Sequence, residues 1–253
     1  MAEDAVAMRF QFANSDEGRP SMDAGSRLES YLREGRTVVT ELYAKELLRD
    51  WGLPVPPCHE AVSLEDALAS AERIGYPVVL KAHSPAILHR SDVGGVRLSL
   101  NGASEVAQAY KELRSACLPL DPKVTFLVQP MVPSGTEVIV GVTEDPQFGS
   151  VVMFGLGGVT AELFKDVVFR IPPLDHPTAL ATISSIRAFP LLAGYRGQPA
   201  ADIDTLADIL VSVSALITKY PCICAMDLNP VIVHPRGADI VDARMVLRPN
   251  PPG

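Results

Sequence analysis

The chain has 253 residues, with 22 basic and 30 acidic side chains and a net charge of −8. This acidic balance disfavours a general nucleic-acid-binding protein. No apolar run approaches the ~18 residues that a membrane helix needs, and the first residues lack the pattern of a secretion signal, so a cytoplasmic protein without a membrane segment is expected. The four cysteines lack zinc-site spacing and are expected to be reduced.

The N-terminal region predicts a tail followed by two helices. Residues 1–26 are polar and aperiodic, which is typical of a flexible tail. Ser26 and Glu29 have the spacing of a capping box and predict the start of a short helix. A second helix is predicted to follow Thr40 and to end at Gly52.

The next part of the chain, about residues 55–131, predicts a first subdomain. Helical spacing of apolar residues begins at Ser63 and stops at Gly75. Three strands and one further helix are predicted from the apolar patterns that follow. Their expected ranges are 77–82, 95–100 and 124–132 for the strands and 104–116 for the helix.

Residues 132–248 predict a second subdomain, with the N-terminal helices 27–52 packed alongside it and a short tail at 249–253. Its expected strands lie within 135–156, in "DVVFRIPPL" and in a long C-terminal hairpin, "CICAMDLNPVIVHPRGADIVDARMVL". Helices are expected at 176–187 and 202–218. Hairpins mixed with helices favour an α+β fold over a doubly wound parallel sheet.

The C-terminal hairpin contains a candidate metal site. Asp227 and Asn229 are two residues apart and share one face of their strand. If the turn centres on residues 235–238, Asp242 lies beside Asn229 on the return strand. Two carboxylates and an amide oxygen suit Mg²⁺, although a solvated polar face is the ordinary interpretation of a single D-x-N pattern.

Three other features have an ordinary interpretation beside a functional one. Lys81 ends an apolar strand, where a lysine can extend to solvent or bind phosphate. The glycine-rich bend "FGLGGV" can serve as a tight turn or bring backbone amides to a phosphate through Gly157 and Gly158. The loop "SPAILHRSDVGGVRL" places His89 among charged residues and glycines, a composition that packing does not explain.

Taken together, the motifs resemble a known family. The segments "GYPVVLKA", "SPAILHRSDVGGVRL", "VQPMVPSGTEVIVGVTEDPQFGSVVMFGLGGVTAELFKDVVFR", "LLAGYRG" and "MDLNPVIV…VDARMVL" occur in the order found in the ATP-grasp β subunit of ADP-forming acetyl-CoA and acyl-CoA synthetases. The chain is similar, more distantly, to the succinyl-CoA synthetase β subunit. The resemblance covers about residues 27–248 and implies an ATP-grasp fold, in which two α+β subdomains clamp a nucleotide.

The resemblance also implies roles for particular residues. Mg²⁺ and ATP or ADP are the implied cofactor and substrates, with Asn229 and Asp242 as metal ligands and Asp227 beside them. His89 matches a histidine proposed to be phosphorylated, and a neutral imidazole is a suitable phosphate acceptor. The implied nucleotide contacts are Lys81 at the phosphates, the hinge residues Gln129, Pro130, Met131 and Val132 at the base, and Glu137 and Arg170.

The implied enzyme works with a partner. In this family a CoA-binding α subunit has its own phosphohistidine, and an α₂β₂ assembly is expected. The reaction would be acid + CoA + ATP ⇌ acyl-CoA + ADP + phosphate. Two alternatives stay open: a regulatory nucleotide-sensing ATP-grasp module, which needs no phosphate-accepting His89, and a stand-alone ATP-grasp ligase, which needs an additional substrate domain.

Overall fold

The computed structural model describes residues 24–87, 93–158 and 166–248. Within these residues the chain forms two compact units. The larger unit comprises residues 24–39, 43–55 and 134–248, with the gap at 159–165, and the smaller unit comprises 40–42 and 56–133, with the gap at 88–92. No helix in the described part of the chain is long and apolar enough to cross a membrane.

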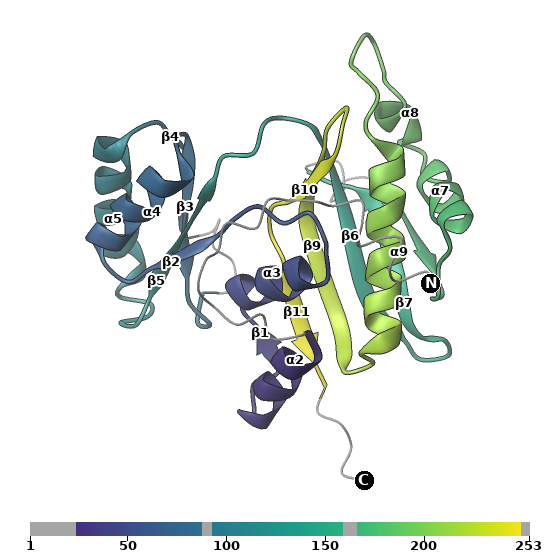
Figure 1. The fold of residues 1–253 in the computed structure, drawn as a ribbon, viewed down its shortest axis with the longest axis horizontal. Helices are drawn as coiled ribbons and strands as arrows, with labels where there is room; N and C mark the ends of the chain where they lie inside the picture. The colour runs from purple at the N-terminus through teal and green to yellow at the C-terminus, as the bar shows by residue number, and fades with distance from the viewer. Residues whose placement is uncertain (1–23, 88–92, 159–165, 249–253) are drawn as a thin grey trace. The chain divides into compact units, whose positions relative to one another are not determined.

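The larger unit is built on a seven-stranded antiparallel sheet (Figure 1). The strand order is β1-β11-β9-β6-β7-β8, and β10 also pairs with β9. In β9, buried and exposed residues alternate from Met226 to Asn229, as expected for a strand with one face in a core, whereas the middle of β6 is buried on both faces. The strands are β1 (Val38–Val39), β6 (Thr136–Asp145), β7 (Gly149–Leu156), β8 (Val167–Arg170), β9 (Ile223–Val233), β10 (Ala238–Ile240) and β11 (Arg244–Leu247).

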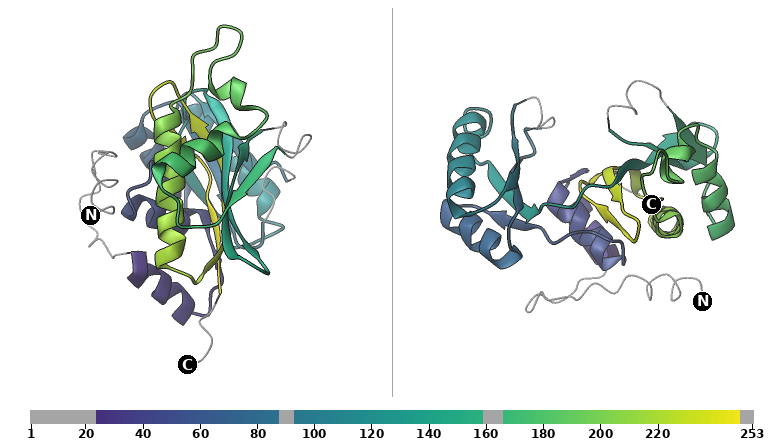
Figure 2. Two further views of the ribbon diagram at one scale, coloured as in Figure 1. Left: turned by 90° about the vertical axis from the view of Figure 1, so that its right-hand side faces the viewer. Right: turned by 90° about the horizontal axis from the view of Figure 1, so that it is seen from above.

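Helices cover one face of this sheet. The apolar helix α9 (Ile203–Lys219) packs against α7 (His176–Ser184) and against β7. Figure 2 shows α9 lying along the sheet from two further directions. The short helix α8 (Phe189–Leu192), α2 (Ala24–Arg33) and α3 (Glu41–Asp50) add apolar side chains to the same core.

The smaller unit has its own core. Its four-stranded antiparallel sheet has the order β2-β5-β3-β4, and helices α4 and α5 pack against each other and against its strands. The elements are β2 (His59–Ala61), α4 (Leu64–Ile74), β3 (Val78–His83), β4 (Val96–Leu100), α5 (Ala103–Cys117) and β5 (Thr125–Pro130).

Most of the predicted elements are present, and the differences concern short or interrupted segments. The predicted helix start at Ser63 is confirmed: its hydroxyl accepts a hydrogen bond from the Asp66 amide, and the Asp66 carboxylate accepts one from the Ser63 amide. The predicted cap at Ser26 is wrong, because α2 already begins at Ala24. Strands β1 and β2 were not predicted, because two or three residues are too short to show alternation.

Candidate functional site

The solvent-facing side of β9 presents the predicted polar pair. Asp227 and Asn229 are exposed. Leu228, which lies between them, and Met226, which precedes them, are buried in the core. Gly141 of β6 pairs with Asp227 from one side. β9 lies in the interior of the sheet, so these side chains stand on a broad sheet face that the described helices of the core do not cover.

Asp242 lies opposite Asn229, as the hairpin pattern predicts. The flanking pairs Ile240–Val231 and Arg244–Asp227 belong to one continuous register. The predicted continuous return strand is wrong, because it is interrupted at residues 241–243, between β10 and β11. Pro230 has no N–H group for a ladder hydrogen bond, and its carbonyl instead accepts one from the Val241 amide at 3.0 Å.

The charges at this face interact. Partial loss of hydration raises the pKa of Asp227, the negative charge of Asp242 raises it further, and the positive charge of Arg244 opposes both effects. Two carboxylates that repel each other, together with an amide oxygen from the same strand, form a donor set that suits a small divalent cation. No group of three or more His, Cys, Asp or Glu side chains with metal-site geometry occurs among the described residues. Mg²⁺ keeps several waters and binds phosphate oxygens, so two carboxylates and one amide oxygen fit it better than they fit a metal held entirely by protein ligands.

The glycine-rich bend lies beside Glu137 of β6. The Gly157 amide donates a hydrogen bond to the Glu137 carbonyl at 2.8 Å. A side chain at Gly157 would place its Cβ 3.0 Å from the Glu137 carbonyl carbon, and one at Gly158 would place it 3.1 Å from Glu137 Oε2. Gly158 also has a φ of +66°, which favours glycine. The bend therefore needs glycine both for its conformation and for its approach to Glu137.

Arg170 does not lie with the acidic side chains. It pairs with Val152, Val152 with Val142, and Val142 with Met226. Directly paired residues point to the same face of a sheet, and these three partners are buried in the core under the helices. Consistently, the Arg170 guanidinium lies 3.5 Å from the Ser185 hydroxyl, just after α7. Arg170 is thus on the opposite face from Asp227 and Asn229.

Arg244 is the cation on the acidic face. It is exposed, pairs with Asp227 across β9 and β11, and partly offsets the rise in the pKa of that carboxyl that burial and Asp242 cause. The sequence analysis did not select it, although "VDARMVL" places it two residues after Asp242. The same hairpin register that places Asp242 would have identified it.

In the smaller unit, Lys81 does not extend to solvent. Its ammonium nitrogen lies 2.9 Å from Glu41 Oε1, and the two side chains are only 6% and 1% exposed. Both residues belong to the smaller unit, although Glu41 is the first residue of α3. The sequence analysis missed Glu41, because no local pattern links residues 40 positions apart.

The predicted hinge follows β5. Gln129 is buried and pairs with Val79, whereas Met131 lies just beyond the strand and donates its amide to the Pro77 carbonyl at 2.9 Å. Pro130 has no N–H group. A ligand bound at this segment would therefore contact its carbonyl oxygens or the backbone amide of Val132. Val132 as a residue is 8% exposed.

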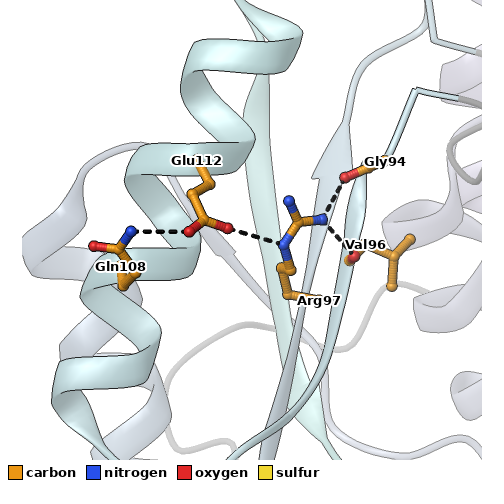
Figure 3. Close-up of polar contacts among 5 residues, drawn as sticks. All are labelled: Gly94, Val96, Arg97, Gln108 and Glu112. Atoms are coloured by element: carbon orange, nitrogen blue, oxygen red, sulfur yellow. Dashed lines mark hydrogen bonds and ion pairs between the residues drawn. The ribbon is translucent and has the colours of Figure 1, made fainter.

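His89 lies outside the described residues, but the chain on both sides of it is fixed. Ile87 is buried in the core of the smaller unit, and the Ala82 amide donates to the Gly95 carbonyl at 2.7 Å. Arg97 binds the Gly94 carbonyl at 2.7 Å and Glu112 of α5 at 3.3 Å (Figure 3).

A second hydrogen bond to Glu112 supports its contact with Arg97. Gln108 donates to the second oxygen of Glu112 at 2.8 Å, and this hydrogen bond, followed by that from Arg97, lowers the pKa of Glu112 (Figure 3). Glu112 is therefore held ionised as the partner of Arg97. The strand that follows the His89 loop is thereby tied to α5.

Comparisons with known proteins identify the family of the chain. Residues 30–247 match the ATP-grasp domain family. The chain is 44% identical over 227 residues to the β subunit of acetate–CoA ligase (ADP-forming) II of Pyrococcus furiosus, covering 87% of this chain and 96% of that protein. It is also 44% identical over 216 residues to acetate–CoA ligase (ADP-forming) I of Archaeoglobus fulgidus, covering 84% of this chain but 31% of that longer protein.

A solved structure of dinucleotide-forming acetyl-coenzyme A synthetase 1 from Ca. Korarchaeum cryptofilum is similar as well. It has a TM-score of 0.80 and 41% identity, covering 89% of this chain and 100% of the compared chain. That structure contains coenzyme A and Mg-AMPPCP, and its phosphohistidine segment points towards the nucleotide binding site.

The class that fold and sequence define is thus an ATP-grasp protein with an α+β fold, as predicted. Within that class, the chain belongs to the family of β subunits of ADP-forming acetate–CoA ligases, which are ligases that form carbon–sulfur bonds.

Proposed function

We propose that this chain is the nucleotide-binding β subunit of an ADP-forming acyl-CoA synthetase, which couples acid + CoA + ATP to acyl-CoA + ADP + phosphate. The observation that supports this best is the placement of Asp242 opposite Asn229, with Asp227 on the same sheet face, in a chain 44% identical to such a subunit. A cytoplasmic location is part of the proposal.

In this proposal the acidic face of β9 holds Mg²⁺. Asn229 and Asp242 bind the ion through their oxygens, and Asp227 lies beside them as a ligand or as an acceptor for its waters. The ion supplies bridging and charge neutralisation of phosphate oxygens. Glu137 and the bend at Gly157 and Gly158 line the nucleotide on the same side. Arg244 takes the nucleotide contact that the family resemblance implied for Arg170.

The smaller unit contributes the remaining contacts in this proposal. Lys81 neutralises phosphate charge as a point cation. The hinge residues Gln129 to Val132 read the base, with the Val132 amide and the hinge carbonyls as the available backbone groups. Catalysis of an in-line phosphoryl transfer then consists mainly of positioning and charge stabilisation.

His89 is proposed to relay the phosphoryl group to ADP from a phosphohistidine on a CoA-binding α subunit, in an α₂β₂ assembly. The tie between Arg97 and Glu112 supports this role, because it fixes the chain that leads away from the loop. The acid is not specified by this chain, since its pocket is expected in the partner.

The test uses the chain coexpressed with a CoA-binding α subunit of this family. The complex should form ATP from acyl-CoA, ADP and phosphate. His89→Asn should abolish this reaction while leaving Mg·ADP binding intact, and Asp242→Asn should weaken Mg·ADP binding itself. Normal turnover in His89→Asn would remove the relay, and unchanged Mg·ADP affinity in Asp242→Asn would remove that carboxylate from the metal site.

A further inference from the structure

The larger unit contains a cavity of about 540 Å³ that the proposed function does not use. This volume is in the range of small-molecule sites. Its lining is drawn from residues 134–136, from residues 191–201 at the end of α8 and in the loop after it, and from residues 233–235. The loop includes the motif "LLAGYRG", to which the proposed function gives no role. Figure 1 shows this loop and the β9–β10 turn at the same end of the unit.

The cavity lies on the core side of the sheet and not on the acidic face. Thr136, in its lining, pairs with Val233. Two residues further along, Val138 pairs with Val231. The three valines are buried in the core under the helices, and residues that are paired, or two apart on a strand, share a face. Glu137 therefore points to the other face, and a ligand in the cavity would not occupy the proposed nucleotide site.

Hydrogen bonds join the two walls of the cavity. The Asp202 amide donates to the His234 carbonyl at 2.7 Å, and the Asp202 carboxylate accepts a hydrogen bond from the Gly237 amide at 2.8 Å. At the base of the loop, the Ala201 amide donates to the Leu192 carbonyl at 2.9 Å. The loop and the β9–β10 turn are thus held against each other, so the cavity is formed before any ligand binds.

Arg196 lies in the lining with a backbone conformation that arginine rarely adopts. Arg196 and Gly197 have φ values of +51° and +82°. The Gln198 amide donates to the Tyr195 carbonyl at 3.1 Å and closes a tight turn around them. Turns with two positive φ values favour Asn, Asp or Gly at the first central position, because other side chains are strained there. The turn itself does not favour arginine at position 196, and strained residues of this kind gather at ligand sites.

The Arg196 guanidinium can bind an anion. It lies 5.3 Å from the centre of the Tyr195 ring, and it forms no hydrogen bond or ion pair with any residue that the structure describes. The chain has 30 acidic residues and a net charge of −8. Even so, the described lining residues include no aspartate, glutamate or lysine. The charge of the lining therefore favours an anionic ligand.

The remaining lining residues narrow the class of anion. Leu191, Pro199, Ala200 and Pro235 present apolar surface in the same cavity. A planar guanidinium matches a carboxylate through two parallel hydrogen bonds. One guanidinium balances one negative charge, which suits a carboxylate better than a doubly charged phosphate.

We propose that this cavity binds an organic monocarboxylate. Arg196 binds the carboxylate group, and the apolar residues of the loop and of the β9–β10 turn contact the hydrocarbon part. The proposal goes beyond the proposed function, which assigns no residue of this cavity. It also does not depend on that function, because the site lies on the other face of the sheet.

Titration with three carboxylates tests the proposal. Propionate, isobutyrate and phenylacetate are added separately to the full chain, in EDTA and without nucleotide, and binding is followed by the amide chemical shifts of the protein. At least one acid should bind saturably, with the shifts concentrated at residues 191–201 and 233–235. The neutral amide of the same acid should bind about 10-fold more weakly or worse, because it lacks the charge that Arg196 binds. Saturable binding by none of the three acids, or equal binding of acid and amide, would overturn the proposal.

Variants of Arg196 test the anion contact itself. Arg196→Asn should weaken the binding of the tightest of these acids by about 10-fold or more. It should also raise the melting temperature, because Asn tolerates a positive φ better than Arg does. The matched control is Arg187→Asn, which removes an exposed arginine of the larger unit outside the lining and should leave the affinity unchanged. Wild-type affinity with a lower melting temperature in Arg196→Asn would show that the arginine serves stability alone, and equal losses of affinity in both variants would show a general charge effect; either result would refute the site.

Discussion

Breaking the Glu41–Lys81 pair should have a large effect on stability. Lys81→Met removes the ammonium that lies 2.9 Å from Glu41, a carboxylate with 1% side-chain exposure. Removing one partner of a buried pair costs about 3–5 kcal/mol. For a chain of this size, that corresponds to a decrease of the melting temperature of about 10 °C.

The double variant Glu41→Gln/Lys81→Met distinguishes the effect of the ion pair on stability from the effect of side-chain packing around it. It removes both charges, so most of the lost stability should return, with a melting temperature well above that of Lys81→Met. Thermal unfolding followed by circular dichroism measures the difference. The matched control is Arg33→Met, which breaks a pair with both side chains 75% exposed and should leave the melting temperature unchanged.

Two outcomes would refute this reasoning. A Lys81→Met protein that melts within 2 °C of wild type, roughly 1 kcal/mol or less, would mean that water or another group compensates Glu41. A double variant no more stable than Lys81→Met would mean that the methionine packs poorly. The loss of stability would then come from packing and not from the broken ion pair.

Two further predictions concern the glycine bend and the strand after the His89 loop. Gly158→Ala and Gly149→Ala both place alanine at a left-handed φ and should each cost about 1–2 kcal/mol. Only Gly158→Ala should also weaken Mg·ADP binding, because its Cβ would lie 3.1 Å from Glu137 Oε2. A Cβ at Gly149 would have no atom within 4 Å. Equal Mg·ADP affinity in both variants would exclude the bend from the nucleotide site. The pKa of Glu112 is lowered in the folded state. Its contribution to folding stability is therefore present at pH values above the ordinary carboxyl pKa and is lost as the pH falls through the folded-state pKa. Glu112→Gln should therefore reduce stability at neutral pH but not in acid, as pH-dependent unfolding would show, and an equal loss at both pH values would contradict this.

The sequence determined the elements and the family. Apolar spacing placed α4, α5 and the long strands, because a strand or helix with one buried face repeats its apolar residues with period 2 or 3.6. The hairpin pattern also placed Asp242 opposite Asn229, since the pairing register follows from where the turn lies. These are local properties, which a stretch of chain encodes by itself.

Only the tertiary structure decided which side chains meet across elements. The Glu41–Lys81 pair joins residues 40 positions apart, and no periodicity signals such a contact. The family resemblance implied a nucleotide contact for Arg170, but the register through β7 and β6 places it on the core face, whereas Arg244 lies with Asp227. For the two arginines, the order and pairing of the strands decide the outcome, because the face that a strand residue takes is set by its partner on the neighbouring strand.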